Sequence, residues 1–326
     1  MILVISYPDE DHTVEVIKRL EGAGRDVTLL DLADFPARSP VVLSWLAADR
    51  PSYVVHGPTG PIELRDTRVC WWRRVRPFTI DDALAVPSLR AFAESETSQA
   101  VGGMLDALHC AWVNPRRADE AAHQKPYQWQ VARDVGLSVP RTLVTSEPEA
   151  ARRFISEVGL GRTVFKAFLA SLEAWRETRL IEQADLDRLD LVRYAPVIFQ
   201  EYVEGVDLRV TIVGDRMFAA EIDARATSYP VDMRMVISEA EVKPTTLPDH
   251  VQGALLALQS RLGLKYGAID MRRTAEGDCV FLEVNPAGQW LFVERLTGLP
   301  ISQAVADYLA TLDDYSGVGR DEEHNW

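Results

Sequence analysis

The stretch from Tyr266 to Trp290 constrains the fold more than any other part of this sequence. Two strand-like runs flank a turn-rich segment, Ala275 to Asp278, so the stretch predicts a β-hairpin. With this loop Thr274 faces Cys279, and the same register places Asp270 directly opposite Glu283. Side chains that face each other across antiparallel strands have Cβ atoms about 4.5–5.5 Å apart. The hairpin therefore predicts two neighbouring carboxylates.

The predicted carboxylate pair needs a positive charge, because like charges at facing positions destabilise a sheet. Asn285 follows Glu283 by two residues, so it lies on the same face and adds a neutral oxygen. Asp270, Glu283 and Asn285 are oxygen ligands suited to Mg²⁺ that is held by few protein groups and by substrate phosphates. The alternative is a surface hairpin whose acidic side chains point to water. Against that alternative, Glu283 lies in an otherwise apolar strand, where a charge is rare without a partner.

Composition limits the partners and the location of the protein. The chain has 326 residues, of which 47% are hydrophobic, and a net charge of −14. This charge argues against a nucleic-acid partner, because phosphate binding needs a basic surface. The sequence has no apolar run as long as a membrane span and no basic signal region at its start, so we expect a cytoplasmic protein without a membrane partner. Its three cysteines form no zinc or redox motif.

Residues 1–114 predict an α/β domain with a parallel sheet. Met1 to Ser6 and Val27 to Leu32 have strand character and flank a helical pattern from His12 to Gly22, which together form a βαβ unit. A later strand ends in the run Trp71-Trp72-Arg73-Arg74. Two interpretations of this run stay open: a site for an anion or a peptide, or an interface strand with Trp71 or Trp72 in the core and arginines at its edge.

Residues 115–196 predict a central domain. Its first helix, Arg117 to Val135, carries Lys125. A second lysine, Lys166, lies in the apolar strand Thr163 to Phe168. A lysine in such a strand either extends its ammonium to the edge or meets a phosphate. The local sequence does not separate these two interpretations.

Residues 197–326 predict a third domain, which carries the opening hairpin. Val197 to Val203 has the apolar character of a buried strand, and Asp207 to Asp223 predicts a hairpin across a Gly-Asp turn. Asp207 and Arg209 share a face of the first strand of that hairpin, because they are two residues apart.

Four arginines lie in or beside the segments expected to line a cleft of the third domain: Arg209, Arg225, Arg234 and Arg272. Two of them fall, with Asp232, in the segment Ala224 to Val242, whose lack of periodicity suits a substrate loop. Arg272 shares a strand face with Asp270. These arginines are candidates for holding a carboxylate or phosphate group of a substrate through bidentate contacts. Alternatively, they are ion-pair partners of the many acidic residues.

The order of these features resembles the ATP-grasp superfamily over roughly Asn114 to Leu312. Within that superfamily the chain is similar to the maturases of ribosomally made graspetides, the microviridin type, which are related to RimK-type ligases. The narrower likeness rests on six motifs: Cys70-Trp71-Trp72-Arg73-Arg74, Asn114-Pro115, Lys125 with Gln128, Gly136-Leu137 through Pro140, Asp232 with Arg234, and Glu283-Val284-Asn285-Pro286-Ala287-Gly288-Gln289-Trp290. The resemblance implies an α/β (α+β) ATP-grasp fold with an N-terminal Rossmann-like pre-ATP-grasp domain.

The resemblance also implies which residues bind ATP. Lys125 and Lys166 match two lysines on the ATP phosphates, and Asp207 matches the acidic residue on the ribose hydroxyls. The linker strand whose backbone reads the adenine edge is matched by four residues: Gln200, Glu201, Tyr202 and Val203.

The same resemblance assigns the metal ligands and a basic residue at the reacting phosphate. Asp270, Glu283 and Asn285 match the Mg²⁺ ligands, and Arg209 matches a basic residue that faces the phosphate. Many members of the superfamily carry a glycine-rich loop over the triphosphate, but here the residues after Lys166 are Ala-Phe-Leu-Ala-Ser-Leu-Glu. What covers the phosphates is therefore open.

The function implied by the resemblance is that of an ATP-dependent ligase. Such enzymes bind a leader peptide, phosphorylate a Glu or Asp side chain of the core peptide, and let a Ser/Thr hydroxyl or a Lys amine displace the phosphate. The implied cofactors are ATP and Mg²⁺, and the implied partner is a ribosomal precursor peptide with a leader and an acidic core that contains Ser/Thr or Lys. The candidate assembly of this chain is a homodimer.

Two alternatives to this function are kept. The first is a RimK-like ligase that joins free amino acids or glutamate to an acceptor. The second is a regulatory protein that binds a nucleotide without turnover. The full Asp, Glu and Asn set argues against the second, because facing carboxylates are costly to retain without a ligand.

Overall fold

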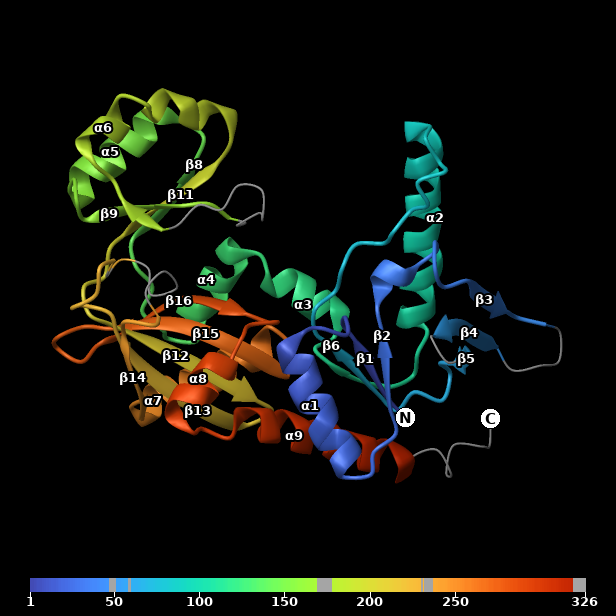
Figure 1. The fold of residues 1–326 in the computed structure, drawn as a ribbon. Helices are drawn as coiled ribbons and strands as arrows, with labels where there is room; N and C mark the ends of the chain where they lie inside the picture. The colour runs from blue at the N-terminus through green and yellow to red at the C-terminus, as the bar shows by residue number, and fades with distance from the viewer. Residues whose placement is uncertain (47–50, 58–59, 169–177, 230, 232–236, 319–326) are drawn as a thin grey trace. The chain divides into compact units, whose positions relative to one another are not determined.

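The computed structural model describes residues 1–46, 51–57, 60–168, 178–229, 231 and 237–318 (Figure 1). Two compact units make up the chain. The first comprises Met1–Asp119, Gly263–Tyr266 and Pro300–Trp326, and the second comprises Glu120–Leu262 and Gly267–Leu299. The last described helix, α9 (Ile301–Val318), belongs to the first unit, although residues 197–326 were expected to form one domain. The division into three domains stays a prediction.

The first unit is built on a parallel four-stranded sheet with the order β2-β1-β6-β7. Its strands are β1 (Ile2–Ile5), β2 (Val27–Leu30), β6 (Val69–Trp72) and β7 (Ala111–Val113). Helix α1 (Asp11–Gly22) joins β1 to β2, and the short helix η1 (Leu32–Asp34) follows β2. The pairing of β1 with β2 and with β6 is parallel, which confirms the predicted βαβ unit.

Helices cover this sheet, and a small antiparallel sheet extends the unit. Residues Leu3 and Ile5 of β1 form a core with the inner face of α2 (Pro87–Asp106). Helices α1 and α9 lie side by side, and α9 packs on β6 and β7 (Figure 1). The second sheet of the unit consists of β3 (Val41–Ser44), β4 (Ser52–Gly57) and β5 (Gly60–Glu63).

Ion pairs fix α9 to the first unit. The carboxylate of Asp313, which is only 2% exposed, accepts a hydrogen bond of 2.7 Å from Arg68 Nε. Arg25 bonds both Asp313 and Asp314. A nearly buried carboxylate is stable only with such partners. Helix α9 is therefore held by arginines from two segments of the first unit, one between α1 and β2 and one between β5 and β6.

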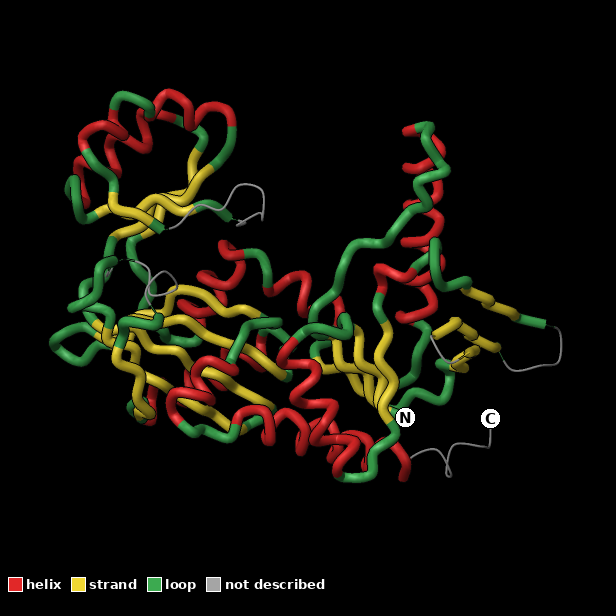
Figure 2. Tube along the Cα trace, in the orientation of Figure 1, coloured by secondary structure: helices red, strands yellow, loops and turns green. Residues whose placement is uncertain are grey.

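The second unit contains two sheets, which the tube drawing separates clearly (Figure 2). The smaller sheet has the order β10-β9-β11-β8 and consists of β8 (Thr142–Thr145), β9 (Thr163–Lys166), β10 (Arg179–Leu180) and β11 (Val197–Glu201). Three helices belong to it: α5 (Pro148–Val158), α6 (Gln183–Leu186) and η2 (Leu189–Tyr194). They pack on the face that carries Phe199, where Ile155 and Val192 join the core.

The larger sheet of the second unit has five strands in the order β14-β13-β12-β15-β16. Its strands are β12 (Val206–Val213), β13 (Arg216–Asp223), β14 (Glu241–Thr245), β15 (Tyr266–Arg273) and β16 (Cys279–Asn285). The helices of this part are α4 (Lys125–Asp134), α7 (Asp249–Arg261) and α8 (Leu291–Thr297). The hairpins β12–β13 and β15–β16 are antiparallel, as the sequence predicted.

The helix expected from Arg117 to Val135 is interrupted. The structure has α3 (Arg116–Ala122) and then α4, with Gln124 as the extended residue that precedes α4. Pro126 explains the break, because proline has no N–H to donate and is favoured in the first turn of a helix. Lys125 therefore occupies the first position of a new helix instead of the middle of a long one.

A buried polar cluster lies beside the carboxyl ends of β1 and β6. Glu10 precedes α1 and accepts hydrogen bonds from the backbone N–H of Thr13 at 2.7 Å and from its hydroxyl at 2.8 Å. His12 Nδ1 lies 2.9 Å from Glu10, and the buried Arg73 guanidinium lies 3.4 Å away. Burial raises the pKa of Glu10, but the hydrogen bond with His12 and the charge of Arg73 outweigh it and bring the pKa to about 2.

This cluster predicts that acid destabilises the protein. The folded pKa of Glu10 lies below the ordinary value of 4.5, so its contribution is present above pH 4.5 and is lost as the pH falls toward 2. Burial also lowers the pKa of His12, so stability starts to fall below pH 6.5. The lowered pKa of Glu10 corresponds to about 3 kcal/mol of folding free energy at neutral pH. Urea titrations followed by circular dichroism at pH 7, 4.5 and 3 check this, with a much flatter pH dependence expected for Glu10→Gln.

The described residues include no helix that is both long enough and apolar enough to span a bilayer.

Candidate functional site

The hairpin β15–β16 places the two predicted carboxylates opposite each other. Asp270 pairs with Glu283, which confirms the predicted register at this position, and Ala268 pairs with Asn285. The expected pairing of Thr274 with Cys279 is wrong, since Cys279 pairs with Arg273. An extra residue on β16, Leu282, forms a bulge that restores the register between the turn and the carboxylates.

Helix α4 fixes this bulged strand from the side. Trp129 Nε1 donates to the carbonyl oxygen of Leu282 at 2.9 Å. The amide of Gln128, which is 2% exposed, both donates to the carbonyl of Val284 and accepts from its N–H, each at 2.9 Å. Gln128 thus satisfies the backbone N–H and carbonyl of Val284, as a neighbouring strand would, between the two predicted metal ligands Glu283 and Asn285. The sequence motif pointed to Gln128, but only the structure shows that it orients Glu283 and Asn285.

The first residue of α4 reaches the carboxylate of β16. Lys125 Nζ forms an ion pair with Glu283, and both side chains are partly buried. The sequence interpretation placed Lys125 on a nucleotide phosphate. Lys125 contacts a predicted metal ligand directly, so its position is compatible with a site that binds both phosphates and a metal ion. The assignment of Lys125 to a phosphate stays a prediction.

Two ion pairs link the neighbouring strands β12 and β15. Each strand carries one aspartate and one arginine two residues apart, so both side chains of each strand lie on one face. Arg209 Nη1 of β12 donates to Asp270 of β15 at 2.6 Å. In return, Arg272 Nη1 of β15 donates to Asp207 of β12 at 2.7 Å. All four charges are therefore compensated on one face of the sheet.

Arg209 is held from a second side as well. It is 7% exposed, and its Nη2 donates to the carbonyl oxygen of Gln289 at 2.8 Å. The neighbouring Gly288 permits this approach, because a Cβ at residue 288 would lie 2.4 Å from the Cβ of Ala268 and 3.0 Å from Arg209 Nη2. Glycine at this position lets the segment after β16 close over the arginine.

Arg272 makes contacts that differ from those expected of a substrate clamp. It is 4% exposed, its Nε donates to the carbonyl of Val203 at 3.0 Å, and its Nη2 donates to the hydroxyl of Tyr202 at 2.6 Å. The guanidinium also lies over the Tyr202 ring, 5.1 Å from the centroid. With Asp207, these partners are three of the residues predicted to bind adenine and ribose. Arg272 therefore supports the predicted nucleotide segment.

The predicted residues of the smaller sheet form their own group. Lys166 Nζ donates to Gln200 Oε1 at 2.8 Å, and Gln200 Nε2 donates to Thr142 Oγ1 at 2.9 Å. Glu201 pairs with the exposed Arg162 at 3.2 Å. Lys166 thus extends its ammonium to a polar partner in the next strand, which is compatible with both interpretations of this lysine.

The predicted substrate loop is described only in part. Arg225 forms a two-bond ion pair with Asp223 at the end of β13, with distances of 2.9 and 2.6 Å. The hydrogen bond from Arg225 lowers the pKa of Asp223 to about 2. Arg234 and Asp232 lie outside the described residues, as do residues 169–177, where a loop over the phosphates was sought. The roles of Arg225 and Arg234 stay predictions.

The chemistry of the donor set fits a magnesium ion. Asp270 and Glu283 supply carboxylate oxygens, and Asn285 supplies an exposed amide oxygen that accepts a hydrogen bond from Ala287 N–H at 2.9 Å. Each carboxylate pairs with a cation, Asp270 with Arg209 and Glu283 with Lys125, as facing carboxylates require. The part of the chain that is described holds no group of three or more His, Cys, Asp or Glu side chains fit for a metal. A magnesium ion held by few protein ligands does not require such a group.

Comparison with known proteins agrees with this architecture. The family model described as the MvdD pre-ATP grasp domain matches residues 1–120. The structure of the macrocyclase MdnB from Microcystis aeruginosa MRC is similar with a TM-score of 0.80 and 30% sequence identity, covering 94% of this chain and 98% of MdnB. The ATP-grasp ligase PsnB, in complex with minimal precursor, Mg and ADP, is similar with a TM-score of 0.78 and 26% identity, covering 96% of this chain and 97% of PsnB.

A relative with another described activity is also similar. The probable alpha-L-glutamate ligase of Xanthomonas oryzae pv. oryzae (strain MAFF 311018) is 27% identical over 242 residues. This match covers 72% of the present chain and 79% of the ligase.

Proposed function

This chain belongs to the ATP-grasp family of maturases of ribosomally made peptides, and we propose that it is a macrocyclase that uses ATP and Mg²⁺ to join side chains within a precursor peptide. The expected ATP-grasp fold with an amino-terminal pre-ATP-grasp domain is confirmed by the same similarity. Within the family, MdnB is described as a macrocyclase, and PsnB has been solved with a precursor, Mg and ADP.

The observation that carries the proposal is the set of charges on one face of the five-stranded sheet. Asp270 and Glu283 face each other, and Lys125 and Arg209 contact them from the helix and the neighbouring strand. Phosphoryl transfer needs mainly positioning and neutralisation of charge. A face that combines oxygen ligands with two cations supplies both.

The residues of this face take separate tasks in the proposal. Asp270, Glu283 and Asn285 would hold Mg²⁺, which neutralises phosphate charge when bound. Lys125 and Lys166 bind the phosphates of ATP. The strand along the adenine is formed by Gln200, Glu201, Tyr202 and Val203. The carboxylate of Asp207 accepts hydrogen bonds from the ribose hydroxyls.

Arg209 is placed to serve the reacting groups. A carboxylate oxygen of a substrate Glu or Asp attacks the γ-phosphorus of ATP, the bond from that phosphorus to ADP breaks, and an acyl phosphate forms. Arg209, held by Asp270 and Gln289, stabilises the negative charge on the transferred group through its guanidinium. A Ser/Thr hydroxyl or a Lys amine then attacks the acyl carbon, and inorganic phosphate leaves with the formation of an ester or an amide. Each ring therefore removes one water from the peptide.

The test is a reaction with purified components. The candidate substrate is any small acidic peptide, rich in Thr and Ser, that is found encoded beside the gene of this chain. We expect mass spectrometry to show a peptide lighter by one water per ring when ATP and Mg²⁺ are present, with one ADP released per ring. A non-hydrolysable ATP analogue is the control and should leave the mass unchanged.

The similarity to the glutamate ligase favours one alternative, a RimK-like addition of amino acids to an acceptor. That activity raises the mass of the acceptor by whole amino-acid residues. Mass gain with free glutamate, and no loss of water from any candidate peptide, would replace the macrocyclase proposal by the alternative.

A further inference from the structure

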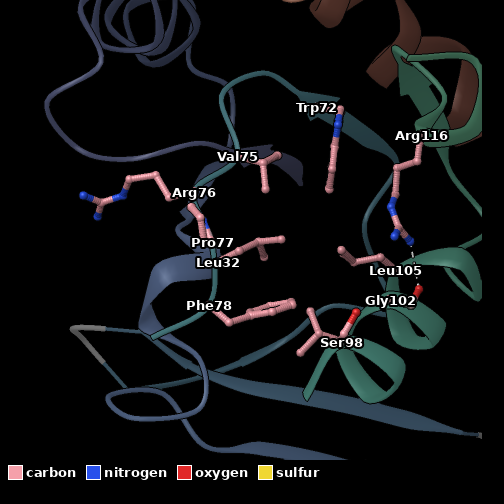
Figure 3. A pocket seen from close by; sticks show the side chains of 11 residues that line it. Leu32, Trp72, Val75, Arg76, Pro77, Phe78, Ser98, Gly102, Leu105 and Arg116 are labelled. Atoms are coloured by element: carbon pink, nitrogen blue, oxygen red, sulfur yellow. Dashed lines mark hydrogen bonds between the residues drawn. The ribbon is translucent and has the colours of Figure 1, made fainter. Parts of the chain in front are cut away.

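A cavity in the first unit shares no lining residue with the proposed catalytic face. It has a volume of about 270 Å³, and Figure 3 shows the Trp72 ring along one side. Two arginines line it, and both already have partners: Arg76 pairs with Asp31, and Arg116 pairs with Asp106 at 2.7 Å. The charges of this cavity are therefore balanced by the protein itself.

The sequence run around the end of β6 contributes to the interior of the first unit. Trp71 is 2% exposed, and Arg73, which is also 2% exposed, is buried beside Glu10. The burial of Trp71 agrees with the interpretation of an interface strand that has this residue in the core. Arg73 is buried instead of lying at an edge. The fold therefore uses both side chains.

The proposed catalytic face, in contrast, depends on a strand at the edge of its sheet. β16 is the last strand in the order β14-β13-β12-β15-β16, so its outer backbone edge meets no further strand of the described sheet. Other parts of the chain bond that edge. The N–H of Phe281 donates to the carbonyl of Ser138 at 2.8 Å, and the amide of Gln128 bonds both backbone groups of Val284 at 2.9 Å. The segment that carries Glu283 is thus held from outside the sheet.

One face of α4 contacts three consecutive residues of β16, and the two elements lie side by side (Figure 1). The three contacts are Trp129 with Leu282, Lys125 with Glu283 and Gln128 with Val284. The contacting residues of α4 are three and four positions apart, a spacing that places them on the same side of a helix. This face of the helix therefore matches, residue by residue, the part of β16 that carries Glu283.

The bulge of β16 brings the two carboxylates together. Its extra residue, Leu282, lets Glu283 pair with Asp270. In a regular pairing continued from the turn, Asp270 would face Leu282, and Glu283 would point to the other side of the sheet. The extra residue of a bulge leaves the ladder of backbone hydrogen bonds, so its carbonyl needs a donor from elsewhere. The indole N–H of Trp129 is that donor, at 2.9 Å.

We propose that Trp129 is a positioning residue for the metal site: its N–H fixes the bulged peptide, and that peptide sets the direction of the adjacent Glu283 carboxylate. The Glu283 side chain is 32% exposed, so packing alone leaves it room to rotate. Mg²⁺ demands nearly ideal octahedral geometry, and a ligand of variable direction therefore weakens its binding. The inference rests on the proposed function, because it assigns Glu283 to Mg²⁺.

Two aromatic residues of α4 offer matched variants. Trp129→Phe removes the N–H donor and keeps an aromatic ring beside β16. Tyr127→Phe removes a donor from an aromatic residue of the same helix, and Tyr127 is 44% exposed. A third variant carries benzothienylalanine at residue 129. This amino acid has the size of tryptophan with a sulfur in place of the N–H, so it separates the loss of the donor from the loss of ring volume.

The experiment uses the full chain and two measurements that need no turnover. Hydrogen–deuterium exchange of the metal-free protein should become about fivefold or more faster at residues 281–285 in both variants of residue 129, the effect of one hydrogen bond of about 1 kcal/mol. Exchange in β13 should stay unchanged. Titration with Mn²⁺, which takes the same oxygen ligands as Mg²⁺, is followed by electron paramagnetic resonance with ADP present. The Kd for Mn²⁺ should rise about fivefold or more, and Tyr127→Phe should match the wild type in both measurements.

Three outcomes contradict the role of Trp129: unchanged exchange at residues 281–285, faster exchange with unchanged affinity for Mn²⁺, or equal effects of Tyr127→Phe. The second outcome would mean that Trp129 only supports the strand. The proposed function is tested separately, by the loss of water from a peptide. A chain that removes water but fails these measurements keeps its function and loses only the role of Trp129. A chain that passes both and removes no water keeps that role, and the macrocyclase proposal alone fails.

Discussion

Replacing Glu283 by glutamine is expected to lower ATP-dependent turnover on the order of 10²–10³-fold or more, because one charge that serves the transferred phosphoryl group is lost. Glutamine keeps the shape of the side chain and can still accept a hydrogen bond from Lys125. The ion pair is partly exposed, so the cost in stability should stay at about 1 kcal/mol or less. Initial rates at several Mg²⁺ concentrations, together with thermal unfolding by circular dichroism, measure both effects.

Glu221 provides the matched control for this substitution. It lies on β13 of the same sheet and pairs with Arg273 at 2.7 Å and with Lys243 at 3.2 Å, away from the facing carboxylates in the strand order. Glu221→Gln removes a paired carboxylate of the same sheet without touching the proposed ligands, so turnover should change little. The metal assignment fails if the double variant Asp270→Asn/Glu283→Gln keeps near-normal activity at limiting Mg²⁺.

The sequence could predict the facing carboxylates because a hairpin is a local structure. Apolar runs on both sides of a turn determine which residues face each other, and Asp270 and Glu283 pair as expected. Next to the turn the predicted register is wrong by one residue, because Cys279 pairs with Arg273 and not with Thr274. The bulge at Leu282 corrects that offset, and the carbonyl of Leu282 accepts a hydrogen bond from Trp129, which lies far away in the sequence. A bulge whose carbonyl is bonded by a distant helix has no signal in the strand pattern.

Nonlocal packing also explains the other differences. The periodicity of residues 301–318 shows an apolar face but not which sheet covers it. In the structure α9 packs on β6 and β7, and its Asp313 pairs with Arg25 and Arg68 of the first unit. Strand alternation placed Arg272 on the same face as Asp270. It could not show that β12 is the neighbour of β15, and this neighbour decides that Arg272 bonds Asp207.

The second large effect is expected at Arg272. Arg272→Met should weaken binding of a non-hydrolysable ATP analogue by tenfold or more, a loss of about 1.4 kcal/mol or more. The reason is that Arg272 holds three parts of the predicted nucleotide segment: the Val203 carbonyl, the Tyr202 hydroxyl and the Asp207 carboxylate. Removing the cation also leaves Asp207, which is 14% exposed, without this partner, and breaking such a pair costs roughly 3–5 kcal/mol of stability. Calorimetric titration and urea unfolding measure the two losses.

Arg209 is the control for the Arg272 experiment. It forms the other ion pair between β12 and β15, with Asp270, and its side chain is nearly as buried as that of Arg272. Arg209→Met should lose turnover and keep most of its affinity for the ATP analogue, since its partners are Asp270 and Gln289. Combining Asp207→Asn with Arg272→Met removes both charges, so the double variant should be more stable than the sum of the single losses predicts. If Arg272→Met instead binds the analogue like the wild type and loses only turnover, Arg272 acts on the substrate, as strand alternation first indicated.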